Sequence, residues 1–164
     1  MRYADGPTTE ATVLVAAPPA RVWPLVSDIF LIATVSRELQ EVQWLPGCAG
    51  PALGARFRGR NFHPQVGEWT TISHVVEYDP PRAFAWAVED PHQPAALWRF
   101  ELVPHGEGTE LRQRARLGPG PSNLTSIIEL MPDKEERIVA GRLREFRAGM
   151  EANLSAIKER AEAG

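Results

Sequence analysis

Four polar residues fall where strand alternation would turn their side chains toward an apolar interior. Asn61 takes such a position on one expected strand, and Thr71 and Ser73 take two on the next. Gln113 lies opposite Phe100 in the register described below. Buried amides and hydroxyls either satisfy one another or orient a bound molecule, because leaving them unpaired is costly. They titrate poorly, so they suit ligand orientation better than proton transfer.

Residues for metal binding or acid–base catalysis are not grouped in the same way. No two histidines have the spacing of a metal-ligand pair, no G-x-S-x-G sequence marks a serine nucleophile, and the glycines at 118–120 lack a phosphate-binding sequence. His74 has the chemistry of a general base, but its expected direction is outward. Glu38 and Glu129 could act as acids only if they were buried. We therefore expect no metal and no cofactor, and we assign no catalytic residue.

The composition is that of an ordinary globular protein. The chain has 164 residues, of which 43% are hydrophobic and 24% are charged, enough for a core in a single domain over 1–164. A net charge of −3 gives no electrostatic footprint for nucleic acid or for an anionic membrane. Arg56, Arg58 and Arg60 alternate, so they would share one strand face, which we interpret as solvated.

Cysteine content and the N-terminal segment bear on the compartment. Cys48 is the only cysteine, so no intrachain disulfide can form, which fits a reducing compartment. The apolar run at 11–17 is too short to span a membrane, and acidic residues precede it, unlike a signal peptide. We interpret this run as a strand. We expect a cytoplasmic protein with no stable membrane insertion.

The expected elements are one strand, two short helices, six strands and a long helix. The alternating, β-branched segment 8–16 predicts the first strand. Pro18 and Pro19 open a short helix, and Asp28 can cap a second one that runs to about Val35. Turn sequences then separate six strand-like segments, and such short connections imply antiparallel neighbours. These strands are expected at 38–45, 53–63, 68–78, 83–89, 96–104 and 109–117.

A short loop at 105–108 sets the register of the last two strands. Leu102 then opposes Leu111, and Phe100 opposes Gln113. One face collects apolar side chains and the other collects charged ones, which is typical of a half-buried antiparallel sheet. The apolar face contains Phe84, Trp86, Val88, Trp98, Phe100, Leu102, Leu111, Gln113, Ala115 and Leu117, and the charged face contains Arg99, Glu101, Glu110, Arg112, Arg114 and Arg116.

The strand at 68–78 has no clean division of faces. A four-residue loop at 79–82 would place Val75 opposite Trp86 and Glu77 opposite Phe84. A bulge that reverses part of the strand, a dimer contact or a covering helix would each explain an outward set that is too apolar for solvent. That outward set consists of Ile72, His74, Val76 and Tyr78.

A long amphipathic helix closes the chain. Ser122 or Asn123 can cap a short helix to about Leu130. Pro132 then interrupts the pattern, and Asp133 can cap the long helix. The apolar residues of that helix recur at steps of three and four and form one stripe. The stripe consists of Val139, Leu143, Phe146, Met150, Leu154 and Ile157.

These elements predict an α+β fold in which a curved antiparallel sheet of about seven strands wraps around the long helix. Such a sheet leaves a cavity against the helix, and large aromatic side chains would line it. Gly141 and Gly149 would either allow close packing of the helix or leave room for a ligand. We predict that the cavity is lined by Trp44, Phe57, Asn61, Trp69, Ser73, Trp86, Trp98, Phe100, Gln113 and Met150.

The local sequence resembles bacterial members of the START-like (SRPBCC) superfamily described as polyketide cyclase/dehydrase-like. The resemblance covers nearly the whole chain and implies a helix-grip fold, β-α-α-β6-α, that encloses a hydrophobic ligand. The superfamily includes plant pollen allergens and steroidogenic lipid-transfer domains, and it shares no catalytic motif. S-R-E at 36–38 departs from the S-P-E of close relatives, a difference that would either alter the pocket rim or have no effect. The matching segments are A-A-P-P-A-R-V-W-P-L-V-S-D at 16–28, W-L-P-G at 44–47, G-A-R-F-R-G-R-N at 54–61 and W-T-T-I-S-H-V-V-E-Y-D-P-P-R-A-F-A-W at 69–86.

Three functions fit this pattern. The first is a binding protein for a small hydrophobic molecule, aromatic or polycyclic, which requires only the pocket. The second is an enzyme resembling aromatase/cyclases, which would need a base and an acid inside the pocket. Because Asn61, Ser73 and Gln113 can orient a ligand but titrate poorly, we favour binding. The third is a protein–protein contact, such as a homodimer, through the apolar outward side chains of 72–78.

Overall fold

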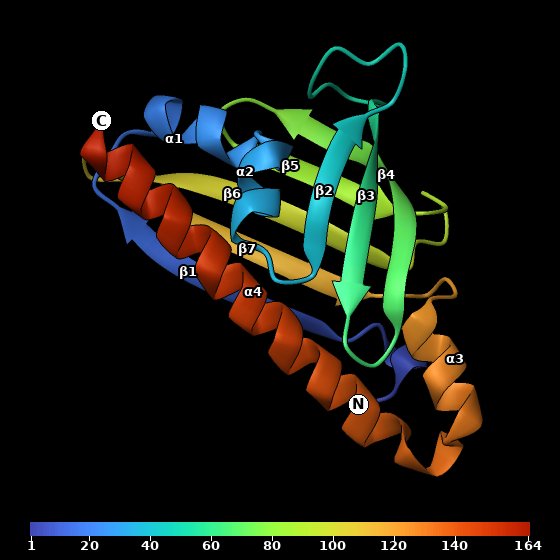
Figure 1. Ribbon diagram of the computed structural model, residues 1–164. Helices are drawn as coiled ribbons and strands as arrows, with labels where there is room; N and C mark the ends of the chain where they lie inside the picture. The colour runs from blue at the N-terminus through green and yellow to red at the C-terminus, as the bar shows by residue number, and fades with distance from the viewer.

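The computed structural model describes residues 1–164 and contains one sheet, one long helix and three shorter helices (Figure 1). This order confirms the predicted α+β helix-grip architecture. The strands are β1 (Thr8–Val15), β2 (Leu39–Trp44), β3 (Arg56–His63), β4 (Gly67–Asp79), β5 (Ala83–Val88), β6 (Ala96–His105) and β7 (Gly108–Leu117). The helices are α1 (Pro19–Val26), α2 (Ile29–Val35), α3 (Asn123–Leu130) and α4 (Glu135–Ala163), with short 3-10 turns η1 (Tyr3–Asp5) and η2 (Pro132–Lys134).

All seven strands form one antiparallel sheet in the order β1-β7-β6-β5-β4-β3-β2. The predicted register of β6 and β7 is confirmed, with Leu102 opposite Leu111 and Phe100 opposite Gln113. β1 pairs with β7, which places Ala11 beside Gln113 on the same face. The first strand therefore forms one edge of the sheet and β2 the other, and the sheet curves between them around α4 (Figure 1).

A bulge in β4 corrects the predicted facing of Tyr78. Val75 does oppose Trp86, but the register shifts between Val75 and Glu77, so that Tyr78 rather than Glu77 opposes Phe84. Val76 is the extra residue, which turns the end of the strand over. The prediction of an outward Tyr78 is therefore wrong. The loop after β4 is one residue shorter than expected, and the bulge absorbs the difference.

Capping side chains set two helix starts, and one predicted cap is wrong. Asp28 begins α2 and Ser122 begins α3, and each accepts a hydrogen bond from the backbone N–H two residues later. Asp133 does not cap α4, because it lies inside η2 and the residue before α4 is Lys134. Glu135 in the first turn of α4 instead places negative charge at the positive end of the helix.

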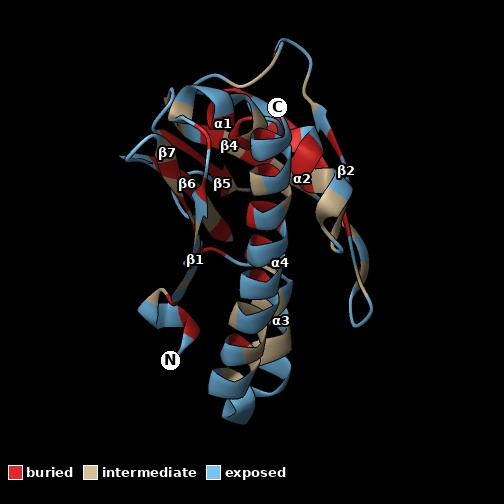
Figure 2. Ribbon diagram, turned by 90° about the vertical axis from the view of Figure 1, so that its left-hand side faces the viewer, coloured by how far each residue is buried: buried red, intermediate tan, exposed pale blue.

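α4 buries one stripe against the inner face of the sheet. Its backbone runs close to β1 and β7, whereas no comparable approach is made to β2, β3 or β4. Figure 2 shows buried residues concentrated in the C-terminal half of α4. No helix of the chain combines the length and the apolar content that crossing a bilayer requires. The buried residues of α4 are Val139, Phe146, Met150, Asn153, Leu154, Ile157 and Ala161.

The outer face of the sheet carries ion pairs that cross from strand to strand. Arg99 on β6 donates a hydrogen bond of 2.8 Å to Glu77 on β4, although β5 lies between them. Ala85 is the β5 residue in that row, and its small side chain lets the guanidinium pass over it. Arg99 also donates to Glu101 at 2.7 Å, and this hydrogen bond holds the pKa of Glu101 below its ordinary value. These ion pairs therefore connect neighbouring strands on the charged outer face of the sheet.

Two neighbouring residues of α4 give a matched test of this packing. Met150 is fully buried, so Met150→Ala should lower the free energy of unfolding by about 2–5 kcal/mol. Gly149 points to open space, where an added Cβ meets nothing within 4 Å, so Gly149→Ala should raise it by about 1 kcal/mol. Urea denaturation followed by circular dichroism measures both. A neutral Met150→Ala would show that the stripe does not pack as described.

Candidate ligand-binding site between the sheet and the long helix

The residues predicted to line the cavity lie on one side of the sheet. Cross-strand pairing puts Phe57 opposite Ser73, Asn61 opposite Trp69 and Phe100 opposite Gln113, all on the face toward α4. Most of the set is enclosed, while three tryptophans keep accessible surface. Phe57, Asn61, Ser73, Trp86, Phe100, Gln113 and Met150 are buried, and Trp44, Trp69 and Trp98 are half-buried.

Aromatic rings form a continuous wall across this inner face. Trp86 lies at its centre, with its ring centroid 6.0 Å from Phe57 and 6.5 Å from Trp98. The wall continues from Phe57 to Trp44 at 5.5 Å, and from Trp98 to Phe146 of α4 at 4.5 Å. Edge-on and offset contacts at these distances stabilise the rings against one another.

The space between sheet and helix has a closed half and an open half. Beneath the C-terminal half of α4, Phe100, Leu111 and Met150 are all 0% exposed. Toward the N-terminal half of α4, inner-face residues such as Trp69 and Trp98 keep part of their surface accessible. These half-exposed residues lie between the β3–β4 hairpin and the first turns of α4, beside the aromatic wall, and we name this region the open half. A hollow of about 400 Å³ lies elsewhere, against Tyr3, Pro119 and Ile128.

Asn61 is held by its own strands. Its amide nitrogen donates to Thr71 Oγ1 at 3.2 Å and to the backbone oxygens of Gly59 and Trp69 at 3.4 Å. An added Cβ at Gly59 would approach Leu39 to 2.9 Å, so this part of β3 is tightly packed. We therefore interpret Asn61 as a structural residue whose hydrogen bonds hold β3 and β4 together.

A buried amide pair joins the sheet to α4. Asn153 Nδ2 donates to Gln113 Oε1 at 3.2 Å, and the two residues are 7% and 1% exposed. Asn153 Oδ1 is buried and has no hydrogen-bond partner. Buried polar atoms are nearly always paired in native proteins, so an oxygen in this position can accept a hydrogen bond from an ordered water or from a bound molecule. The sequence signal for Asn153 was its place as the one polar residue in the buried stripe of α4.

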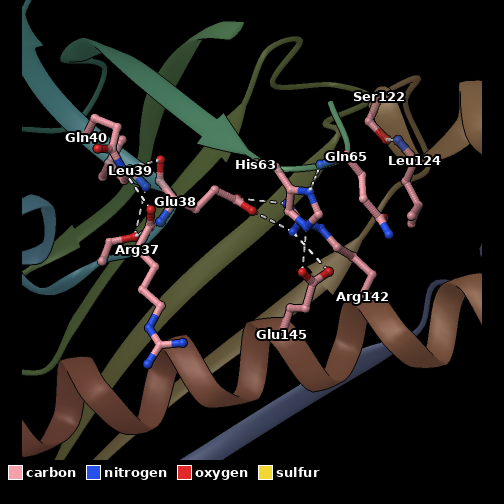
Figure 3. Close-up of polar contacts among 11 residues, drawn as sticks. Arg37, Glu38, Leu39, Gln40, His63, Gln65, Ser122, Leu124, Arg142 and Glu145 are labelled. Carbon is pink, nitrogen blue, oxygen red and sulfur yellow. Dashed lines mark hydrogen bonds and ion pairs between the residues drawn. The ribbon is translucent and has the colours of Figure 1, made fainter. Parts of the chain in front are cut away.

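Charged and polar residues gather where the open half meets solvent, and we name Glu38, His63, Arg142 and Glu145 the edge cluster (Figure 3). Arg142 binds both carboxylate oxygens of Glu38, at 2.6 and 2.8 Å. His63 Nε2 lies 2.7 Å from Glu145 Oε2. Burial disfavours the charged guanidinium, but the ion pairs with Glu38 and Glu145 outweigh burial and raise the pKa of Arg142 above its ordinary value.

The acids and bases singled out in the sequence are not brought together on the inner face of the sheet. Glu38 belongs to the edge cluster as the partner of Arg142, and Glu129 is exposed on α3. His74 is half-buried on β4 and, by its pairing with Arg56, faces outward. The chain has no group of three or more side chains arranged to hold a metal ion. The inner face thus offers amides, hydroxyls and aromatic rings.

Comparison with known proteins supports the architecture, through one protein that is similar in sequence and structure and two that are similar in structure. The Polyketide_cyc-like protein Cgl2372 from Corynebacterium glutamicum is 31% identical, covers 95% of this chain and 91% of its own, and superposes with a TM-score of 0.65. The di-domain ARO/CYC StfQ from the steffimycin biosynthetic pathway is 17% identical with a TM-score of 0.72, over 95% of this chain and 51% of that one. Ara h 8.0201 is 12% identical with a TM-score of 0.60, over 96% and 99%. The last two show the fold alone.

A family model gives the assignment. No curated protein matches the sequence. The model for polyketide cyclase/dehydrase and lipid transport, however, matches residues 7–162, nearly the whole chain. Together with the similarity to Cgl2372, this match shows that the chain belongs to the polyketide cyclase/dehydrase and lipid transport family.

Proposed function

We propose that this protein binds a small hydrophobic molecule, with an aromatic or polycyclic ring system, in the open half beside the aromatic wall. A polar substituent of that molecule would meet the buried amide pair. The observation that carries the proposal is the unpaired Asn153 Oδ1, buried between helix and sheet. A hydroxyl or N–H group on the ligand would supply the missing donor.

The spacing of the inner-face groups suits a molecule of a few fused rings. Gln113 lies two residues along β7 from Ala115, which pairs with Trp98, so strand rise puts the amide about 7 Å from the tryptophan row. Phe146 and Asn153 lie seven residues apart on α4, which is about 10 Å along the helix. A ligand ring packed beside the contacting Trp98 and Phe146 rings would therefore reach the amide pair with one substituent.

A polyketide cyclase/dehydratase-like reaction in the same pocket is the second candidate. The fold shared with StfQ, whose name describes an ARO/CYC protein, and the pair formed by His63 and Glu145 at the pocket rim favour it. Incubation with a linear poly-β-ketone, followed by mass spectrometry, tests it, because dehydrative cyclisation removes water. Product formed by wild-type protein and not by His63→Asn would support an enzyme. An unchanged mixture would leave ligand binding as the remaining candidate function.

Native mass spectrometry of protein purified from a related bacterial host tests the binding proposal directly. A defined small-molecule adduct that is lost on denaturation would support it and give the ligand mass. A clean apo mass, together with no heat of binding for any apolar aromatic compound, would contradict it.

Polar recognition predicts a preference between two model ligands of similar size. 2-Naphthol can donate a hydrogen bond to Asn153, whereas 2-methoxynaphthalene cannot. We expect wild-type protein to bind the naphthol about tenfold more tightly in calorimetric titrations, as one buried hydrogen bond contributes about 1–1.5 kcal/mol. Asn153→Leu should remove the difference while keeping the affinity for 2-methoxynaphthalene. Equal affinities in wild-type protein would show that Asn153 does not contact the ligand.

The amide pair also predicts a pattern in stability. Gln113→Leu removes the one partner of Asn153 and should lower the free energy of unfolding by about 1–3 kcal/mol. The double variant Gln113→Leu/Asn153→Leu replaces both amides with apolar groups and should recover most of that loss. Urea denaturation measures both. A double variant less stable than either single variant would make the pair structural.

A further inference from the structure

The sheet contacts α4 closely on the side of β1 and β7 and much less on the side of β2 and β3. On the β1 side, α4 makes close backbone contact, and its last turns bind the end of β1 directly: Lys158 Nζ donates to the Leu14 oxygen, and Glu162 accepts from the Ala16 N–H, both at 2.8 Å. On the opposite side, β2 and β3 have no comparable backbone approach to α4. The polar links across that side are the two made by the edge cluster.

The first link is the bidentate ion pair between Arg142 and Glu38, and further contacts hold each of the two side chains in place. Glu38 lies at the turn from α2 to β2, where Ser36 Oγ accepts from its backbone N–H at 3.2 Å. The Arg142 side chain is 17% exposed, and its guanidinium carbon lies 4.6 Å from the centre of the Phe146 ring. Because Phe146 contacts Trp98, the link ends against the wall of the open half. Bidentate pairs of this kind are geometrically specific.

The second link shares Glu145 with the first. Glu145 Oε1 lies 3.5 Å from Arg142 Nη1, while Oε2 meets His63 Nε2. The Gln65 N–H donates to His63 Nδ1 at 3.1 Å, so Nδ1 is the acceptor and Nε2 carries the proton toward Glu145. His63 ends β3 at the hairpin turn. The edge cluster is therefore one connected network from the α2–β2 turn, through α4, to the tip of the β3–β4 hairpin (Figure 3).

We propose that the edge cluster is the latch of the pocket, and that the ligand enters and leaves when the β2–β3 edge swings away from α4. This inference rests on the proposed binding function. The apolar stripe holds α4 to the β1 side, and on the other side α2 packs on α4, so the part free to open is the β2–β3 edge beyond α2. Breaking the latch lowers the barrier to passage in both directions. It therefore changes the rates of binding and release by the same factor and leaves the affinity nearly constant.

The test uses the neutral fluorophore N-phenyl-1-naphthylamine in stopped-flow mixing with the full chain. Glu38→Gln keeps the shape of the side chain and removes its charge. We expect its association and dissociation rates both to rise about tenfold, with the dissociation constant within about twofold of wild type. Glu41→Gln is the matched control, because Glu41 lies three residues further along, on β2, but pairs with Arg60, 3.3 Å away on the outer face. Its rates should equal those of wild type.

A second measurement keeps the latch testable without a ligand. Hydrogen exchange of the β2 and β3 amides should be faster in Glu38→Gln than in Glu41→Gln, while exchange in β1 and β7 stays the same. Fluorophore binding with unchanged rates would overturn the latch and leave the proposed function standing. Absence of binding by every variant would count against the proposed function, and unchanged exchange in Glu38→Gln would then overturn the latch independently.

Discussion

The structure depends on the burial of one side of α4 against β1 and β7. Met150, Leu154 and Ile157 fill that contact almost completely, and hydrophobic burial fixes the helix there. The sheet then curves away from the helix toward β2, so the strands at that edge cannot meet α4 through short apolar side chains. The open half, its half-exposed tryptophans and the long charged side chains that bridge the remaining distance all follow from this divergence.

The inner face combines two environments with opposite demands. Aromatic rings stabilise one another and can remain partly exposed, as Trp69 and Trp98 do, whereas a buried amide oxygen without a partner is unfavourable. The protein places the amide pair in the closed half, next to Phe100 and Met150, and Trp98 lies two residues along the sheet from it, toward the open half. A molecule that brings both a ring and a hydrogen-bond donor would satisfy both demands together, which is the physical basis for preferring an amphipathic ligand over a hydrocarbon.

Alternation along the strands was sufficient to predict the sheet, its faces and most of its register. It failed at Tyr78, because a loop one residue shorter and a bulge at Val76 leave the same apolar pattern. It also missed Asn153, since counting only apolar residues passes over a polar residue in the same stripe. The edge cluster could not have been found, because Arg142 is 104 residues from Glu38 in the chain, and only the curvature of the sheet brings them together.

The bulge at Val76 divides β4 into two stretches whose inward side chains make different contacts. Before the bulge, Trp69 and Ser73 lie on the inner face of the sheet, with Asn61 and Phe57. After it, Tyr78 packs against Trp23 of α1, with ring centroids 5.7 Å apart. Because facing alternates with every residue, a deletion of one residue inside β4 would exchange inner and outer side chains over one of these stretches. The exposed loop between β2 and β3 carries no such constraint. In descendants of this chain, length variation should therefore accumulate in that loop and be nearly absent from β4.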